Sequence, residues 1–183
     1  MAVLKVARLG DPILRQIAKP VNLENIRDNK DIQLLIDDMI DTMRMEKGVG
    51  LAAPQVSRSI QVVVLECAGS ERYPDRNEFP LIALINPVFT KYSEETVSGW
   101  EGCLSLPGLR GLVPRSREVA LEAYNRMGEK VFIETDGFFA IALQHEIDHL
   151  NGIVFVDRMT DLAKLSYQEE FETYWMKEDV IEV

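Results

Sequence analysis

The sequence predicts an α+β fold in which short antiparallel β-strands and sheets pack around a central buried helix, followed by a helix towards the C-terminus. Three observations predict it. Residues 31–46 have the apolar periodicity of an amphipathic helix, residues 138–151 are apolar on nearly all sides at first, and the chain between them consists of short β-branched runs separated by turn residues. A chain of 183 residues can bury a core of its own, so we expect residues 1–183 to form one domain, with residues 157–183 as a helical tail.

Composition and charge exclude several classes of protein. Hydrophobic residues make up 46% and charged residues 27% of the chain, as in soluble globular proteins. The net charge of −10 argues against a general phosphate-binding surface, so no nucleic-acid partner is expected. Charged residues interrupt the first apolar positions, and no apolar run is long enough to cross a membrane. These features predict a cytoplasmic protein in which Cys67 and Cys103 do not form a disulfide.

The first third of the chain predicts helices and a loop of small residues. Asp11 is a suitable N-cap for a short helix that begins at Pro12. Residues 31–46 carry a continuous apolar stripe and are expected to be scaffold. Residues 48–55, Gly-Val-Gly-Leu-Ala-Ala-Pro-Gln, have little side-chain bulk. They are either a helix C-cap followed by a loop, or a backbone that a ligand approaches closely, with the amide of Gln55 as a donor.

The middle of the chain predicts strands, and the rest predicts two helices. We expect strands at 60–65, 81–85 and 91–100, with a surface loop at 68–80. Residues 117–124 and 130–134 flank Asn-Arg-Met-Gly and predict a hairpin. A helix over 138–151 ends before Gly152, which is a good C′ residue. From residue 160 the pattern is again helical in character.

The strongest functional signal is His145-Glu146-Ile147-Asp148-His149, which contains the only two histidines of the chain. Residues i and i+4 lie on one face of a helix, so His145 and His149 can bind one metal ion. Glu146 is then placed to act on a metal-bound water. The alternative is an ordinary helix whose histidines pack or face water. Cys103 is the natural third ligand, because thiolate and imidazole together suit a divalent iron or zinc ion. Cys67 is expected to be a buried structural residue.

Three separated motifs resemble the signature motifs of the peptide deformylase family. They are Gly48-Val49-Gly50-Leu51-Ala52-Ala53-Pro54-Gln55, Glu101-Gly102-Cys103-Leu104-Ser105 and Gln144-His145-Glu146-Ile147-Asp148-His149. The likeness extends from Gly10 to about Asp157. It implies a metal-dependent hydrolase that removes the N-formyl group from the N-terminal methionine of nascent polypeptides and releases formate. It also implies one divalent ion, with Fe²⁺ as the ion expected in the cell and Zn²⁺, Ni²⁺ or Co²⁺ as ions found in preparations.

The resemblance also implies roles for individual residues. Cys103, His145 and His149 would hold the metal with one position open, as in catalytic sites. Glu146 would transfer the proton, and the Gln55 side chain and the backbone N–H of Leu104 would stabilise charge on the formyl oxygen.

Further roles concern the substrate and the surroundings of the metal. For the substrate, the candidates are Val49, Gly50, Arg110, Ile141 and Ala142, with Arg110 meeting the distal part of the peptide. Glu101 would accept a ring N–H from a ligand histidine. Asp148 either pairs with Arg115 or is a plain surface acid.

Two other functions remain open. H-E-x-x-H also occurs in zinc endopeptidases, in which Glu169 or Glu170 would be the third ligand; the metzincin form is excluded, because Phe155 stands where its third histidine belongs. A non-enzymatic metal-stabilised binding protein would need a closed four-ligand site. Contact with the ribosome exit region is not supported, because residues 157–183 carry eight acidic and three basic residues.

Overall fold

The structure is a computed structural model that describes residues 2–67 and 78–176 of the chain. The expected loop at 68–80 lies mostly outside the described residues, as does the end of the expected tail. The helices are Lys30–Met45 (α1), Gly137–Leu150 (α2) and Gln168–Glu170 (α3), the last of which continues as a π-helical turn, Phe171–Trp175. The strands are Gly50–Ala52 (β1), Val62–Cys67 (β2), Phe79–Tyr92 (β3), Thr96–Cys103 (β4), Leu106–Ser116 (β5), Glu118–Tyr124 (β6), Lys130–Asp136 (β7) and Leu165–Tyr167 (β8).

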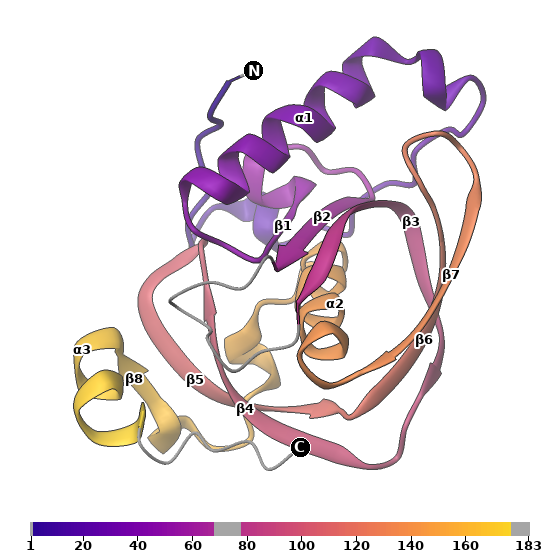
Figure 1. Cartoon of the computed structure of the whole chain (residues 1–183). Coiled ribbons are helices and arrows are strands. Elements are labelled where there is room, and N and C mark those ends of the chain that lie inside the picture. Colours follow the sequence, from indigo (N-terminus) through magenta and orange to yellow (C-terminus); the bar gives the residue numbers. More distant parts are fainter. Residues whose placement is uncertain (1, 68–77, 177–183) are drawn as a thin grey trace.

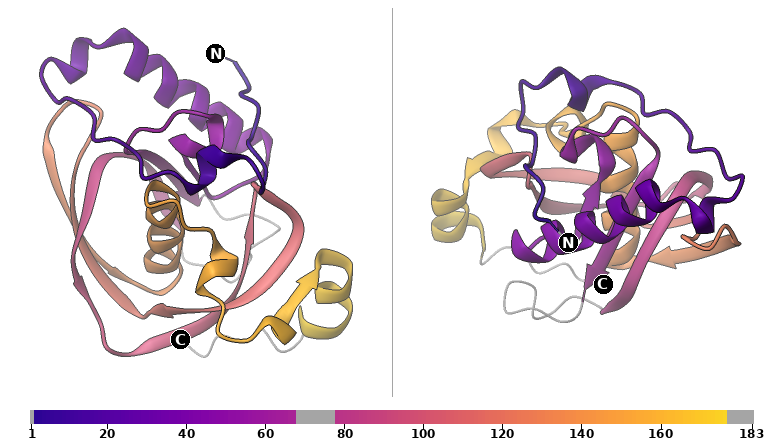
Figure 2. Two further views of the ribbon diagram at one scale, coloured as in Figure 1. Left: turned by 180° about the vertical axis from the view of Figure 1, so that it is seen from behind. Right: turned by 90° about the horizontal axis from the view of Figure 1, so that it is seen from above.

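Two antiparallel sheets surround α2. One has the strand order β1-β2-β3-β6-β7 and the other the order β4-β5-β8. Figure 1 and the view from behind in Figure 2 show α2 enclosed by these strands, whereas α1 lies outside them, over β1 and β2. This arrangement is the α+β fold with a central buried helix that the sequence predicts, and that prediction is confirmed.

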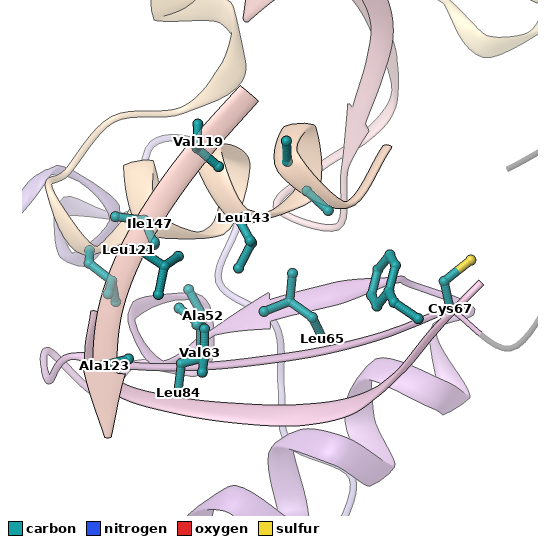
Figure 3. Close-up of a cluster of buried hydrophobic side chains, with 14 of the residues drawn as sticks. Ala52, Val63, Leu65, Cys67, Leu84, Val119, Leu121, Ala123, Leu143 and Ile147 are labelled. Carbon is teal, nitrogen blue, oxygen red and sulfur yellow. The ribbon is translucent and has the colours of Figure 1, made fainter. Parts of the chain in front are cut away.

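The core has two large clusters, one on each face of β2. Val63 and Leu65 point towards α2, and they pack with Leu143 and Ile147 of that helix and with side chains of β1, β3 and β6 (Figure 3). Val62 and Val64 point the other way and pack with the apolar stripe of α1. Successive side chains of a strand face opposite sides, so a strand buried on both faces is apolar at every position. This is why β2 reads as a continuous apolar run.

Several elements agree with their prediction. Both long helices begin and end within one residue of the expected positions. Asp11 accepts a hydrogen bond from the Ile13 N–H at the start of the 3₁₀ turn Pro12–Arg15. Strands β6 and β7 form the expected hairpin, with Tyr124 opposite Lys130. No helix among residues 2–67 and 78–176 is long and apolar enough to span a membrane.

Other elements differ from their prediction. The expected loop at 48–55 contains strand β1 and the 3₁₀ turn Ala53–Val56. The expected strand at 91–100 is divided between the end of β3 and the start of β4, because a turn separates the two. Residues 106–116 form β5, which was not predicted.

The tail was also predicted wrongly near its start. Leu162–Lys164 form a 3₁₀ turn, but Leu165–Tyr167 pair with Leu109, Arg110 and Gly111 as strand β8, and the α-helix begins at Gln168.

Candidate metal centre

Cys103 and the two histidines meet on the inner side of β4. His145 and His149 lie on α2, one turn apart, and Cys103 is the last residue of β4. Their ligand atoms all lie within 4.8 Å of one another, and Sγ of Cys103 is 3.3 Å from Nε2 of His149. One thiolate and two imidazoles at these separations are suited to hold a divalent metal ion.

Glu146 faces the same point and is held there by the close approach of β1. It is 4% exposed, and its Oε2 is buried without a hydrogen-bond partner among the described residues. A Cβ atom at Gly50 would lie 2.3 Å from Oε1 of Glu146. Gly50 is therefore required by the position of Glu146. Glu146 lines the same cavity as Cys103 and His145, and its unpaired carboxylate oxygen is consistent with a group that exchanges a proton with water there.

Gln55 comes to the site from the 3₁₀ turn after β1. Its Oε1 accepts a hydrogen bond from the Ala52 N–H at 2.8 Å, which fixes the orientation of the amide. Its Nε2 is therefore directed at Sγ of Cys103, 3.5 Å away, and at Oγ of Ser105, 3.2 Å away. Leu104 and Ser105 form the two-residue turn between the paired residues Cys103 and Leu106. The N–H of the first residue in such a turn is not used by the turn's own hydrogen bond, and Leu104 lines the same cavity as Gln55.

A buried network of charged side chains, formed by Glu101, Arg115 and Asp148, contacts His145 through Glu101. Nδ1 of His145 is 2.7 Å from Oε2 of Glu101. Arg115 donates two hydrogen bonds to Glu101, at 2.7 and 3.0 Å, and a third to Asp148. Asp148 is buried and also accepts from Arg158, so it pairs with Arg115 and is not a plain surface acid. If the Nδ1–H of His145 donates a hydrogen bond to Glu101, Nε2 carries no proton and its lone pair is available to a metal.

The network and the burial of the site shift the pKa values of its members. Burial would raise the pKa of Glu101, but the hydrogen bonds from His145 and Arg115 outweigh burial and hold it at about 2. Burial raises the pKa of Glu146 to about 7. Burial also lowers the pKa of His149 well below its ordinary value, and the nearby charges of His145 and Arg115 add to this effect. His149 is therefore neutral near pH 7, which is the form that binds a metal.

A cavity of about 240 Å³ opens onto the metal-ligand cluster. The five residues expected to bind the substrate all line it: Val49, Gly50, Arg110, Ile141 and Ala142. Ile141 and Ala142 are 5% exposed and form an apolar wall on α2. Arg110 stands on β5, and Gln168 of α3 lines the cavity beside it.

The structure does not bring the alternative ligands to this centre. Glu169 and Glu170 lie exposed on α3, and neither belongs to the group of possible metal ligands that the described residues form. Phe155 is buried and stacks on the His145 ring with a centroid distance of 6.4 Å. Cys67 lies in the apolar core, as expected of a structural cysteine.

Sequence reasoning missed several residues around the centre. Trp100, Phe138 and Gln168 line the cavity, Ser105 accepts from Gln55, and Arg158 pairs with Asp148. Ser105 is two residues from Cys103, so the motif itself carried a signal for it. Arg158 had no local signal, because its contact with Asp148 depends on the chain path after α2.

Comparison with known proteins agrees with this geometry. Residues 3–165 match the family model described as polypeptide deformylase. The chain is 44% identical to peptide deformylase 1 of Bordetella pertussis and 46% identical to peptide deformylase 2 of Pseudomonas putida, each over 164 residues, 90% of this chain and 92% of the relative. A crystal structure of a class I type b peptide deformylase from Acinetobacter baumannii, with Met-Ala-Ser bound, superposes with a TM-score of 0.82 at 42% identity and covers 86% of this chain and 99% of that chain. The peptide deformylase of Thermotoga maritima gives a TM-score of 0.78 at 35% identity and covers 88% of this chain and 100% of that chain.

Proposed function

The chain belongs to the polypeptide deformylase family and is a hydrolase, and we propose that it removes the formyl group from N-formylmethionine at the start of nascent polypeptides, releasing formate. One observation carries the proposal: Cys103, His145 and Glu146 line a single cavity together with the amide donor Gln55. The A. baumannii relative binds Met-Ala-Ser, a peptide that begins with methionine. For such a substrate we propose a cytoplasmic location, where nascent chains emerge.

The family is metal-dependent, and the residues of this centre fit an ion. Cys103, His145 and His149 would hold it, with Fe²⁺ as the proposed ion and Zn²⁺, Ni²⁺ or Co²⁺ as substitutes. When bound, the ion supplies a Lewis acid that polarises the formyl carbonyl and makes a water molecule more acidic. Three protein ligands would be the number expected of a catalytic site, whereas a structural site would need a fourth.

Glu146 is the proposed proton carrier. Its unpaired Oε2 can accept the proton of the attacking water and deliver it to the amine nitrogen that leaves. In the metal-free protein burial raises the pKa of Glu146 to about 7, and the charge of a bound divalent ion would lower it again. The geometry that allows this depends on Gly50, since any larger residue there would meet the carboxylate.

Gln55 and Leu104 are the proposed donors to the formyl oxygen. Negative charge collects on that oxygen as the carbonyl carbon becomes tetrahedral, and donors that are already oriented stabilise it without reorganising. The Gln55 amide is oriented by its bond to the Ala52 N–H, and the Leu104 N–H by the turn between β4 and β5.

The walls of the cavity suit a methionine side chain. The proposed apolar slot for this side chain is formed by Val49, Ile141 and Ala142. The backbone of Gly50 is proposed to hydrogen-bond to the peptide. Arg110 lines the cavity too and is proposed to contact the peptide beyond methionine.

The charges behind His145 are proposed to hold the ligand in place. Glu101 orients the imidazole, and Arg115, which also pairs with Asp148, keeps Glu101 ionised and in place. The endopeptidase alternative is not favoured by the comparisons, and the exposed position of Glu169 and Glu170 gives it no third ligand.

The test is formate release from formyl-Met-Ala-amide by protein made anaerobically with Fe²⁺, beside Cys103→Ala and Glu146→Ala. We expect both variants to lose activity for different reasons: Cys103→Ala loses metal, whereas Glu146→Ala keeps it. Cys67→Ala is the matched control, because Cys67 lies in the core away from the centre. Folded, metal-loaded protein that releases no formate would refute the proposal, and peptide cleavage retained by Cys103→Ala would support an endopeptidase.

A further inference from the structure

The segment after residue 165 forms part of the cavity, although the family model ends there. Strand β8 pairs with β5 in a register that sets Ser166 opposite Arg110. Two residues later, Gln168 reaches the Arg110 side chain, and its Oε1 accepts a hydrogen bond from Nε of Arg110 at 2.6 Å. Both residues line the cavity. The register of β8 therefore determines which residue of the tail meets Arg110.

Aromatic contacts fix this segment against the three-stranded sheet. The ring of Trp100 on β4 lies 5.0 Å from that of Phe171 and 5.7 Å from that of Trp175. Lys164 lies over the Trp175 ring at 3.7 Å. Aromatic pairs at these separations stabilise a fold beyond the area they bury. Gln168 is thus carried by a packed element.

Arg110 is a buried cation that has no carboxylate partner in the part of the chain that the structure describes. It is 6% exposed, and no carboxylate among the described residues lies within ion-pair distance of it. Its partners are the neutral amide of Gln168 and the ring of Phe171, 5.7 Å from Cζ. Glu172 accepts from Nε2 of Gln168 and so reaches Arg110 only through that amide. Buried arginines are normally paired with acids, and within the described part of the chain this one has no anion beside it.

The two terminal amino groups of the guanidinium are left to donate to an anion. Gln168 uses Nε, and the terminal amino groups have no hydrogen-bond acceptor among the described residues. Nη1 lies against the Gly102 backbone, where an added Cβ would come within 2.5 Å of it. A guanidinium held at Nε presents its terminal groups in a fixed orientation, which suits a carboxylate.

We propose that Gln168 is a positioning residue that holds Arg110 to receive a carboxylate of the substrate downstream of methionine, so that the enzyme favours peptides with an acidic residue there. This inference rests on the proposed function, because the cavity must bind a peptide that begins with formylmethionine. A neutral residue at 168 is essential to it. A glutamine orients the guanidinium and leaves its charge for the substrate, whereas a glutamate would orient it and neutralise it.

The test compares peptides that differ only in one charge. Formate release is measured for two pairs of peptides. One pair is formyl-Met-Ala-Asp-Ala-amide and its Asn counterpart, and the other has Asp or Asn directly after methionine. Formyl-Met-Ala-Ser as free acid and as amide distinguishes a terminal carboxylate from a side-chain one. We expect wild-type protein to have a KM about tenfold lower for the better Asp peptide than for its Asn counterpart, as one charge-assisted hydrogen bond would give.

Two variants separate positioning from charge. Gln168→Met should reduce the Asp-to-Asn ratio to about one or two by raising KM for the Asp peptide, because the charge remains but its orientation is lost. Gln168→Glu should also abolish the ratio, here because the guanidinium is neutralised. Glu169→Gln, exposed on the same helix, is the control and should keep the wild-type ratio.

Equal KM values for all Asp and Asn peptides in wild-type protein would overturn the proposal, as would a full ratio in Gln168→Met. Calorimetric binding of the deformylated peptides Met-Ala-Asp-Ala-amide and Met-Ala-Asn-Ala-amide gives the same ratio without turnover. It keeps the inference testable if formate release fails. Activity on formyl-Met-Ala-amide, which lacks the downstream residue, reports on the proposed function alone.

Discussion

Substitution of Gly50 by alanine tests how tightly the position of Glu146 is set. The added Cβ would lie 2.3 Å from Oε1 and 2.6 Å from Cδ of Glu146. An unstrained carbon–oxygen contact is about 3.3 Å, so the carboxylate must move by about 1 Å. It cannot move freely, because Glu146 is 4% exposed and Gly50 is paired with Leu65. A displacement of that size typically costs about 100-fold in rate, or about 2.7 kcal/mol of barrier.

The assay is kcat/KM for formate release, with bound metal measured on the same samples. We expect Gly50→Ala to lose about two decades of activity with its metal retained, since the substitution touches none of the three ligands. Gly48→Ala is the matched control: its nearest neighbour would be the flexible end of Leu104 at 3.0 Å, so the loss should be much smaller. A fully metallated Gly50→Ala with kcat/KM within about threefold of wild type would refute the argument that close packing holds Glu146 in place.

Three further predictions concern the same centre. Gln55→Leu should lower kcat by about 100-fold or more with metal content intact, and wild-type turnover would remove Gln55 as a donor. Arg115→Met leaves Glu101 buried without its cation and should cost about 3–5 kcal/mol in urea unfolding; a loss below about 1 kcal/mol would contradict a structural role for the pair. In the metal-free protein, burial raises the pKa of Glu146 to about 7. The protonated carboxyl therefore stabilises the fold fully at a pH below the pKa of this group in the unfolded chain, and this stability is lost as the pH rises through 7. Chelated wild type should lose about 3 kcal/mol between pH 5 and pH 8 relative to Glu146→Gln, and parallel curves would show that the carboxyl is not buried in this way.

The elements that were predictable from sequence are those set by local pattern. The stripe of α1 repeats at helical spacing over about three turns, and the first half of α2 is apolar on nearly all sides, so both helices could be placed closely. Strand β5 contains Pro107 and Pro114, which argue against a strand. It forms because β8 covers only Leu109 to Gly111, so β5 is an edge strand at both prolines.

The residues of the centre were predictable where they belong to short sequence motifs. His145 and His149 are one helical turn apart, and Cys103 follows from the need for a third ligand. Gln168 was not predictable, because it meets Arg110 across 58 residues and only through the pairing of β8 with β5. The apolar residues Leu165 and Tyr167 are two apart, which is strand spacing, but three residues are too short a run to distinguish from the helix that follows.

The packing of α2 has a consequence for how the protein acquires its ion. Leu143 and Ile147 anchor the helix in an apolar cluster, and Gln144 binds the backbone of Ser116 through both its amide atoms, at 3.1 and 2.9 Å. Neither contact involves the ion, so the ligands are held in position before it arrives. Chelation should therefore leave a folded protein, in contrast to small domains that unfold without their metal. Ion identity is then decided by exchange with the ions around the folded protein, and growth medium and oxygen exposure should change the occupant without changing the fold.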